Sequence, residues 1–93
     1  MPRIAARIDN NQVEIVSGLR KAGYSVLSLP LGRGVPDLLV ASRTKTVLME
    51  VKDGKHKLNK MQIAWHDAWA APVEVVRSLQ DALLVMRGRI GNR

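Results

Sequence analysis

The chain has 93 residues, and its 15 Lys and Arg against eight Asp and Glu give a formal net charge of +7. It contains no Cys, which excludes disulfides and Cys-ligated metal sites. No apolar run reaches the roughly 18 residues of a transmembrane helix, and residues 1–12 lack the apolar core of a signal peptide, so the sequence predicts a cytoplasmic protein with no membrane partner.

The length predicts one domain over residues 1–93, with a core at about 9–86 and basic arms at both ends. A domain of this size buries only about 60–65% of the surface of its unfolded chain, so dimerisation would add stability. The excess of positive charge points to a polyanionic partner, for which nucleic acid is the default.

The first helix is predicted from an Asp9 N-cap, with Gln12 at the third helical position, to about Ala22. Gly23 is then a C-terminal stop. Glu14 lies in the first turn, where a carboxylate interacts favourably with the helix dipole. It could also be an outer ligand to a metal or water, but its spacing alone favours the dipole interpretation.

A first strand over residues 24–29 and a turn-rich loop over 30–36 are predicted next. A hairpin then follows over 37–52, with its polar turn at 42–45. Alternate residues on one face of the hairpin are all apolar and are predicted to be core: Leu38, Val40, Val47, Met49 and Val51.

A turn centred on Arg43 and Thr44 pairs hairpin residues whose numbers sum to 87, so Asp37 opposes Glu50. Lys52 lies on the same face as Glu50, because strand side chains alternate. Two opposed carboxylates repel each other unless a cation lies between them, and carboxylate oxygens suit Mg²⁺ or Mn²⁺. A neighbouring ammonium can stabilise a phosphate or help to activate a water. The pattern therefore predicts a metal-dependent nuclease, whereas either short motif alone is more typical of a turn or an exposed ion pair.

A second helix is predicted from Asn59 to about Ala70, with Gln62 completing a capping box. Trp65 and Trp69 are four residues apart and are predicted to pack together on the sheet rather than to stack on bases.

His66 has no second His at metal-ligand spacing and is predicted to lie at the surface or the rim of the site. A last strand over 73–77 and a helix from a Ser78 capping box, with Asp81 at the third helical position, to about Met86 complete the chain. The order is helix, three strands, helix, strand, helix.

Basic side chains surround the acidic pair in the sequence and are predicted to contact the phosphate backbone of nucleic acid. They are Arg33, Lys55, His56, Lys57 and Lys60.

The order αβββαβ, with Pro36-Asp37 on one strand and Glu50-x-Lys52 on the next, resembles the PD-(D/E)xK nuclease superfamily. More narrowly, the segments GVPDLLV and LMEVKDG and the Gln62-x-x-Trp65 pair resemble the VRR-NUC domain. The resemblance runs from about Asp9 to Met86. It implies an α/β fold with a restriction-endonuclease-like αβββαβ core, in which helices flank a central mixed four-stranded sheet.

The positions that match catalytic residues of this superfamily are Asp37, Glu50, Lys52, Gln62 and Glu14. The resemblance implies that Asp37 and Glu50 hold Mg²⁺ or Mn²⁺ together with the Val51 carbonyl. It also implies that Lys52 positions or activates the attacking water.

The sequence thus predicts a Mg²⁺- or Mn²⁺-dependent DNA endonuclease. By resemblance to small stand-alone phage and bacterial members, it would act as a homodimer on branched DNA such as Holliday junctions. The alternative is a non-catalytic nucleic-acid-binding module of the same fold. A third possibility, an interaction protein without nucleic acid, fits the net charge less well.

Overall fold

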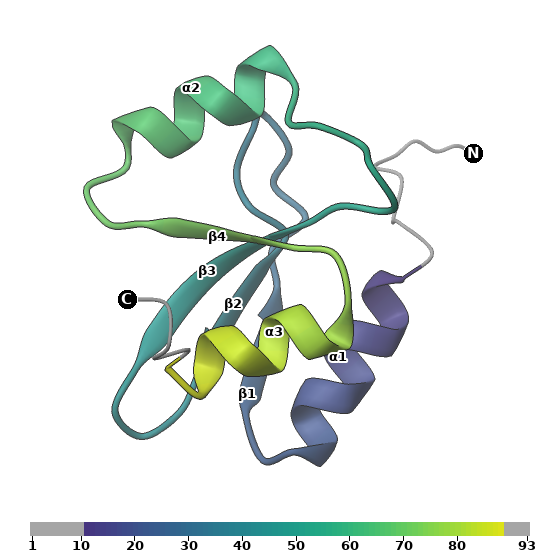
Figure 1. Cartoon of the computed structure of the whole chain (residues 1–93). Helices are drawn as coiled ribbons and strands as arrows, with labels where there is room; N and C mark the ends of the chain where they lie inside the picture. The colour runs from purple at the N-terminus through teal and green to yellow at the C-terminus, as the bar shows by residue number, and fades with distance from the viewer. Residues whose placement is uncertain (1–10, 89–93) are drawn as a thin grey trace.

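A mixed sheet with the strand order β1-β2-β3-β4 organises the part of the chain that the computed structural model describes, residues 11–88 (Figure 1). In chain order the elements are α1 (Gln12–Lys21), β1 (Ser25–Ser28), β2 (Leu38–Ala41), β3 (Thr46–Val51), α2 (Lys60–Ala68), β4 (Val73–Val76) and α3 (Leu79–Met86). The predicted α/β class, with helices flanking a mixed four-stranded sheet, is confirmed. The basic arm at residues 1–8 and the tail at 89–93 lie outside the described residues.

The hairpin has the predicted register. Leu39 pairs with Leu48 and Ala41 pairs with Thr46, so the partners sum to 87. β1 pairs antiparallel with β2, whereas β4 pairs parallel with β3. Parallel neighbours need a crossover connection, and α2 supplies it.

One face of the sheet packs against α1 and α3, which lie together beside it in Figure 1. The core consists of apolar side chains from both layers, all at most 6% exposed: Ile15, Leu19, Leu38, Val40, Met49, Val51, Val76, Ala82, Val85 and Met86. The predicted apolar face of the hairpin is therefore the core face, and its remaining member Val47 is partly buried against the cluster. Alternation then places Glu50 on the opposite face, toward α2.

The predicted N-terminus of the first helix is wrong. The helix begins at Gln12 after an Asn11 N-cap, so Gln12 is the first helical residue and not the third, and Asp9 lies outside the described residues. The Asn11 side chain makes no cap hydrogen bond, and its Nδ2 donates to the carbonyls of Lys52 (3.1 Å) and Arg77 (3.0 Å). Asn11 thus joins α1 to the ends of β3 and β4.

α1 ends at Lys21 with Ala22 as its C-cap, and Gly23 follows as the predicted C-terminal stop. The N–H of Gly23 donates to the Arg20 carbonyl and that of Tyr24 donates to the Leu19 carbonyl, which is the Schellman pattern. Gly23 has a φ of 100°, a conformation that costs other residues free energy. This stop turns the chain into β1.

The last helix has its predicted N-cap, since Ser78 Oγ accepts the Asp81 N–H at 3.0 Å. The reciprocal hydrogen bond of the predicted capping box, from the Ser78 N–H to the Asp81 side chain, is replaced. Asp81 Oδ2 accepts the N–H of Arg77 instead, one residue earlier. In residues 11–88, no helix has both the length and the apolar character needed to cross a membrane.

Candidate active site

Asp37 immediately precedes β2, and its carboxylate is hydrogen-bonded to the end of β3. Its Oδ2 accepts the backbone N–H of Val51 at 2.8 Å. Ser42 and Lys45 are a hydrogen-bonded pair of this antiparallel ladder, since the Ser42 N–H donates to the Lys45 carbonyl. Hydrogen-bonded pairs recur at every second residue, so in a regular ladder Pro36 and Val51 would form such a pair. The N–H and the carbonyl of Val51 both point toward β2. Because Pro36 has no N–H, β2 cannot supply a backbone donor to the Val51 carbonyl. A carboxylate and a backbone carbonyl therefore meet at this strand end.

Glu50 is the one charged residue that is buried among the described residues, at 2% exposure. A buried carboxylate loses its hydration and needs compensating partners. One of them is Gln62 of α2, whose Nε2 donates to Glu50 Oε2 at 3.0 Å. The side chain of Glu50 is thus held between the sheet and α2.

Gln62 serves the helix and the carboxylate at the same time. Its N–H donates to Asn59 Oδ1 at 2.9 Å and its Oε1 accepts the Asn59 N–H at 3.0 Å, so the predicted capping box is present. The opposite end of the same amide donates to Glu50. The start of α2 is therefore fixed by the residue that contacts the carboxylate.

His66 was predicted at the surface or the rim, and this is wrong for its side chain, which is only 11% exposed. Its Nε2 lies 3.6 Å from Glu50 Oε1. His66 is one helical turn beyond Gln62, so both side chains leave α2 on the side of Glu50. The spacing Gln62-x-x-x-His66 is the sequence signal that could have suggested the pair.

Lys52 directly follows β3, and continued alternation of the side chains would place it on the same side of the sheet as Glu50. Burial lowers the pKa of His66, the adjacent Asp67 carboxylate partly raises it, and the Lys52 ammonium lowers it further. The backbone of Lys52 is fixed by its N–H to the Val76 carbonyl and by its carbonyl to Asn11.

The loop before β2 forms the opposite wall of this site. A hollow of about 250 Å³ is lined by residues that include Arg33, Gly34, Asp37 and Gln62. A Cβ on Gly34 would lie only 2.4 Å from the carbonyl oxygen of Met61, so only glycine lets the loop approach α2 this closely. Arg33 has a φ of 57°, which is rare for a residue other than glycine. The structure thus brings Arg33 to the rim beside Asp37.

The donor set fits a hard divalent cation. Among residues 11–88, no group of three or more His, Cys, Asp or Glu side chains is placed to hold a metal ion. Mg²⁺ is usually bound by one or two carboxylates, with waters and substrate phosphates as its other ligands. Asp37, Glu50 and the Val51 carbonyl match that smaller set.

Glu14 is not brought to this site. It is exposed on α1 and lines a hollow against α3 with residues such as Ser78 and Arg87. Its position in the first turn of α1 is consistent with the interaction with the helix dipole.

The basic loop after β3 is exposed at Lys55 and Lys57, and Lys60 is exposed at the start of α2. Its backbone is anchored by Arg77, whose Nη1 donates to the carbonyls of Gly54 (2.9 Å) and His56 (2.8 Å). The loop therefore presents its ammonium groups from a fixed backbone.

The two Trp residues stack on each other with ring centroids 4.8 Å apart, and they face the sheet across a hollow. They line an apolar hollow of about 430 Å³ together with Leu39 and Leu48, and Trp69 is 48% exposed. None of the residues of α2 is fully buried. The polar contacts of Gln62 and His66 with Glu50 therefore contribute to holding α2 against the sheet.

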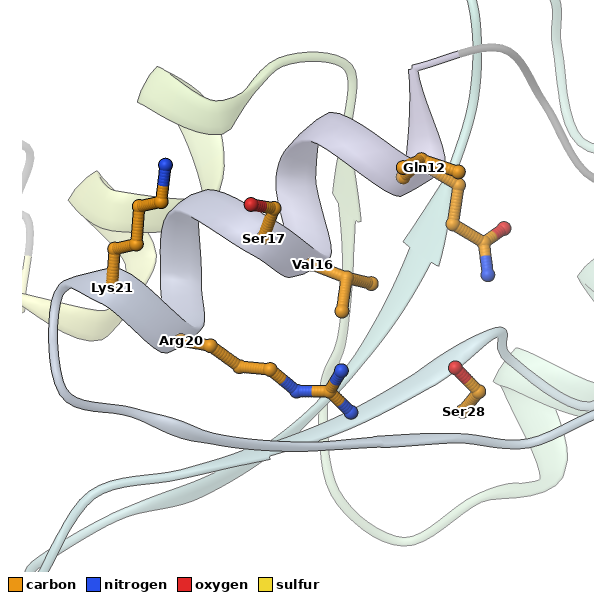
Figure 2. A pocket seen from close by; sticks show the side chains of 7 residues that line it. Gln12, Val16, Ser17, Arg20, Lys21 and Ser28 are labelled. Atoms are coloured by element: carbon orange, nitrogen blue, oxygen red, sulfur yellow. The ribbon is translucent and has the colours of Figure 1, made fainter.

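A separate hollow of about 440 Å³ lies between α1 and β1, away from the carboxylates (Figure 2). Arg20 extends across it toward the edge strand and donates to the Val26 carbonyl at 2.8 Å, whereas Lys21 points away. Among residues 11–88, none of those that line this hollow is a carboxylate, unlike the hollow beside Asp37.

The site thus lies in an α/β domain in which Gln62 and His66 of α2 contact the Glu50 carboxylate, while the Asp37 carboxylate is hydrogen-bonded to the N–H of Val51, the residue after Glu50. Comparison of the chain with models of known protein families and with curated proteins finds no match.

Proposed function

We propose that this protein is a Mg²⁺- or Mn²⁺-dependent endonuclease that hydrolyses phosphodiester bonds of DNA. The observation that carries the proposal is the hydrogen bond from the Val51 N–H to Asp37, because it joins one carboxylate to the peptide between Glu50 and Lys52. The resemblance of these motifs to the VRR-NUC domain of PD-(D/E)xK nucleases supports the same function.

Asp37, Glu50 and the Val51 carbonyl would hold the metal ion. When bound, the ion stabilises negative charge on the scissile phosphate and lowers the pKa of a coordinated water. Gln62 keeps the Glu50 carboxylate in place through its 3.0 Å hydrogen bond.

Lys52 would add a positive charge to a site whose other charged groups are two carboxylates. Its ammonium would orient the attacking water and stabilise the charge that develops on the phosphate oxygens. Its backbone is fixed on both sides by β4 and Asn11, so the side chain starts from a defined position.

The net charge of +7 supports DNA as the partner, and Arg33, Lys55, Lys57 and Lys60 would contact its phosphates. Homodimers acting on branched DNA, in DNA repair or in phage replication, are part of the proposal. Exposed apolar side chains support a second copy as partner, among them Leu31 (64%), Met61 (59%) and Trp69 (48%). The compartment would be the cytoplasm of a bacterial or phage-infected cell.

The test is cleavage of labelled four-way junction, flap and linear duplex DNA in Mg²⁺, Mn²⁺ or EDTA. Lys52→Ala is run beside the wild type, with Lys21→Ala as a control for the loss of one exposed positive charge on α1. We expect metal-dependent cutting that Lys52→Ala loses by at least about a hundredfold, in line with the loss of one charge-stabilising group, and that Lys21→Ala retains.

Cutting by Lys52→Ala at the wild-type rate would overturn the site assignment. Tight binding of DNA without cutting in either metal would instead favour the non-catalytic binding module.

A further inference from the structure

Two side chains of α2 approach the two oxygens of one buried carboxylate. Gln62 Nε2 donates to Glu50 Oε2 at 3.0 Å, and His66 Nε2 lies 3.6 Å from Glu50 Oε1. The two contacts come from successive turns of one helix, so a single rigid element acts on both oxygens.

A histidine at this position costs folding stability if its side chain serves only to fill space. Its side chain is 11% exposed, and among residues 11–88 its buried Nε2 has no hydrogen-bond partner. A separation of 3.6 Å is longer than a hydrogen bond, and a buried polar atom without one costs stability. An apolar ring would avoid that cost, which suggests that the polar edge of the imidazole matters for what Glu50 does.

We propose that His66 is a positioning residue that, together with Gln62, fixes the orientation of the Glu50 carboxylate at the end of β3. This inference rests on the proposed function where it concerns metal binding, because Glu50 is there a metal ligand. Groups that orient a ligating carboxylate change metal affinity by about 10- to 100-fold when they are removed.

The His66 atom nearest to Glu50 is Nε2, so the variants are chosen to keep or remove a polar group at that position. A glutamine places its amide nitrogen near the position of Nε2, so His66→Gln keeps a polar group toward Oε1. His66→Phe keeps a ring of similar size without the polar edge. His66→Asn keeps an amide that is too short to reach Oε1. Ile63→Phe adds a ring at a position of α2 that is 47% exposed and serves as the control.

The first measurement needs no metal and no DNA. The chain has three glutamates, Glu14, Glu50 and Glu74, so labelling their carboxyl carbons with ¹³C gives three signals, and Glu50→Gln assigns the one of interest. In EDTA we expect His66→Phe and His66→Asn to move the Glu50 signal, while His66→Gln restores it toward its wild-type position. The signals of Glu14 and Glu74 should stay in place.

The second measurement is the affinity of the folded protein for Mn²⁺ alone, by titration calorimetry. We expect His66→Phe and His66→Asn to weaken Mn²⁺ binding by at least about tenfold. His66→Gln should stay within about threefold of the wild type, and Ile63→Phe should not differ from it.

The inference fails if the Glu50 signal is unchanged in His66→Phe and His66→Asn, or if His66→Gln perturbs it as much as they do. If His66→Phe does not fold, the comparison of His66→Asn with His66→Gln decides. If the wild type neither binds Mn²⁺ nor cuts DNA while the Glu50 signal follows the expected pattern, the positioning role stands and the nuclease proposal falls.

Discussion

The Asp37 carboxylate accepts the backbone N–H of Val51 at 2.8 Å, and it so replaces the Pro36 carbonyl, which would accept this N–H in a regular β2–β3 ladder. The ladder bond is replaced by a side chain at the point where the strands separate. The same carboxylate therefore has a structural role and, in the proposed function, a chemical one.

Two substitutions at Asp37 should separate these roles. Asp37→Asn retains an oxygen acceptor for the Val51 N–H, so we expect its free energy of unfolding to stay within about 1 kcal/mol of the wild type. Asp37→Ala leaves that N–H without its acceptor and should cost about 1–3 kcal/mol. Both should abolish metal-dependent cleavage. Urea unfolding and the junction cleavage assay measure the two effects. Equal stability of the two variants would contradict the structural role.

Gly34 and Gly32 form a matched pair in the loop beside the site. Both have positive φ, at 86° and 68°, but only a Cβ on Gly34 meets backbone, 2.4 Å from Met61 O. Gly32→Ala should cost about 1–2 kcal/mol from backbone strain alone. Gly34→Ala should cost about 1–3 kcal/mol more, because the loop and the start of α2 must move apart. Urea unfolding compares them, and equal midpoints would rule out the close approach.

The exposed lysines of the loop and of α2 should account for a defined part of the salt dependence of DNA binding. Each phosphate contact contributes about 0.9 to the slope of log affinity against log salt concentration. Replacing Lys55, Lys57 and Lys60 together with Gln should therefore reduce the slope by about 2 to 3.

The matched control for this prediction replaces three exposed basic residues elsewhere, Lys21, Arg43 and Arg87, and changes the net charge equally. Fluorescence anisotropy on duplex DNA, in an Asp37→Asn background that does not cut, gives both slopes. If the two triple variants lose the same slope, the loop is not the binding surface.

The stability of the metal-free protein should depend on His66 below neutral pH. Folding lowers the pKa of His66, chiefly through burial, so the unfolded chain binds more protons between the folded value and the unfolded value of about 6.5. The stabilisation is present above about pH 6.5 and is lost as the pH falls through the folded pKa.

Urea unfolding in EDTA between pH 7.5 and pH 5 tests this dependence. The wild type should lose more stability over the range than His66→Gln, by at most about 1.4 kcal/mol for each unit by which the pKa is lowered. Ile63→Phe changes no titratable group of α2 and provides the control, since it should keep the wild-type dependence. Identical pH profiles for the wild type and His66→Gln would contradict the prediction.

Local interactions explain which predictions from sequence were confirmed. The Asn59–Gln62 capping box and the Gly23 stop depend on residues within one turn, so their spacing is visible in the chain. The hairpin register follows from a short turn and from the pleat, which together leave one pairing that buries the apolar face.

Long-range contacts explain the errors. The Asn11 amide nitrogen donates to carbonyls at the ends of β3 and β4, from residues 41 and 66 positions away, and no local pattern around Asn11 shows these contacts. His66 looked like a rim residue because helical spacing does not show which side of α2 faces the sheet.

The sequence by itself determined the element order, the hairpin register and the placement of Asp37, Glu50 and Lys52 on one hairpin, because turns, caps and strand alternation act over a few residues. Only the tertiary structure decided what surrounds those groups. The docking of α2 buries Glu50 and brings Gln62 and His66 to its two oxygens, while α1 carries Glu14 to the other side of the sheet. These contacts arise because packed layers set the rotation of each helix, and that rotation depends on the whole core rather than on any short stretch of the chain.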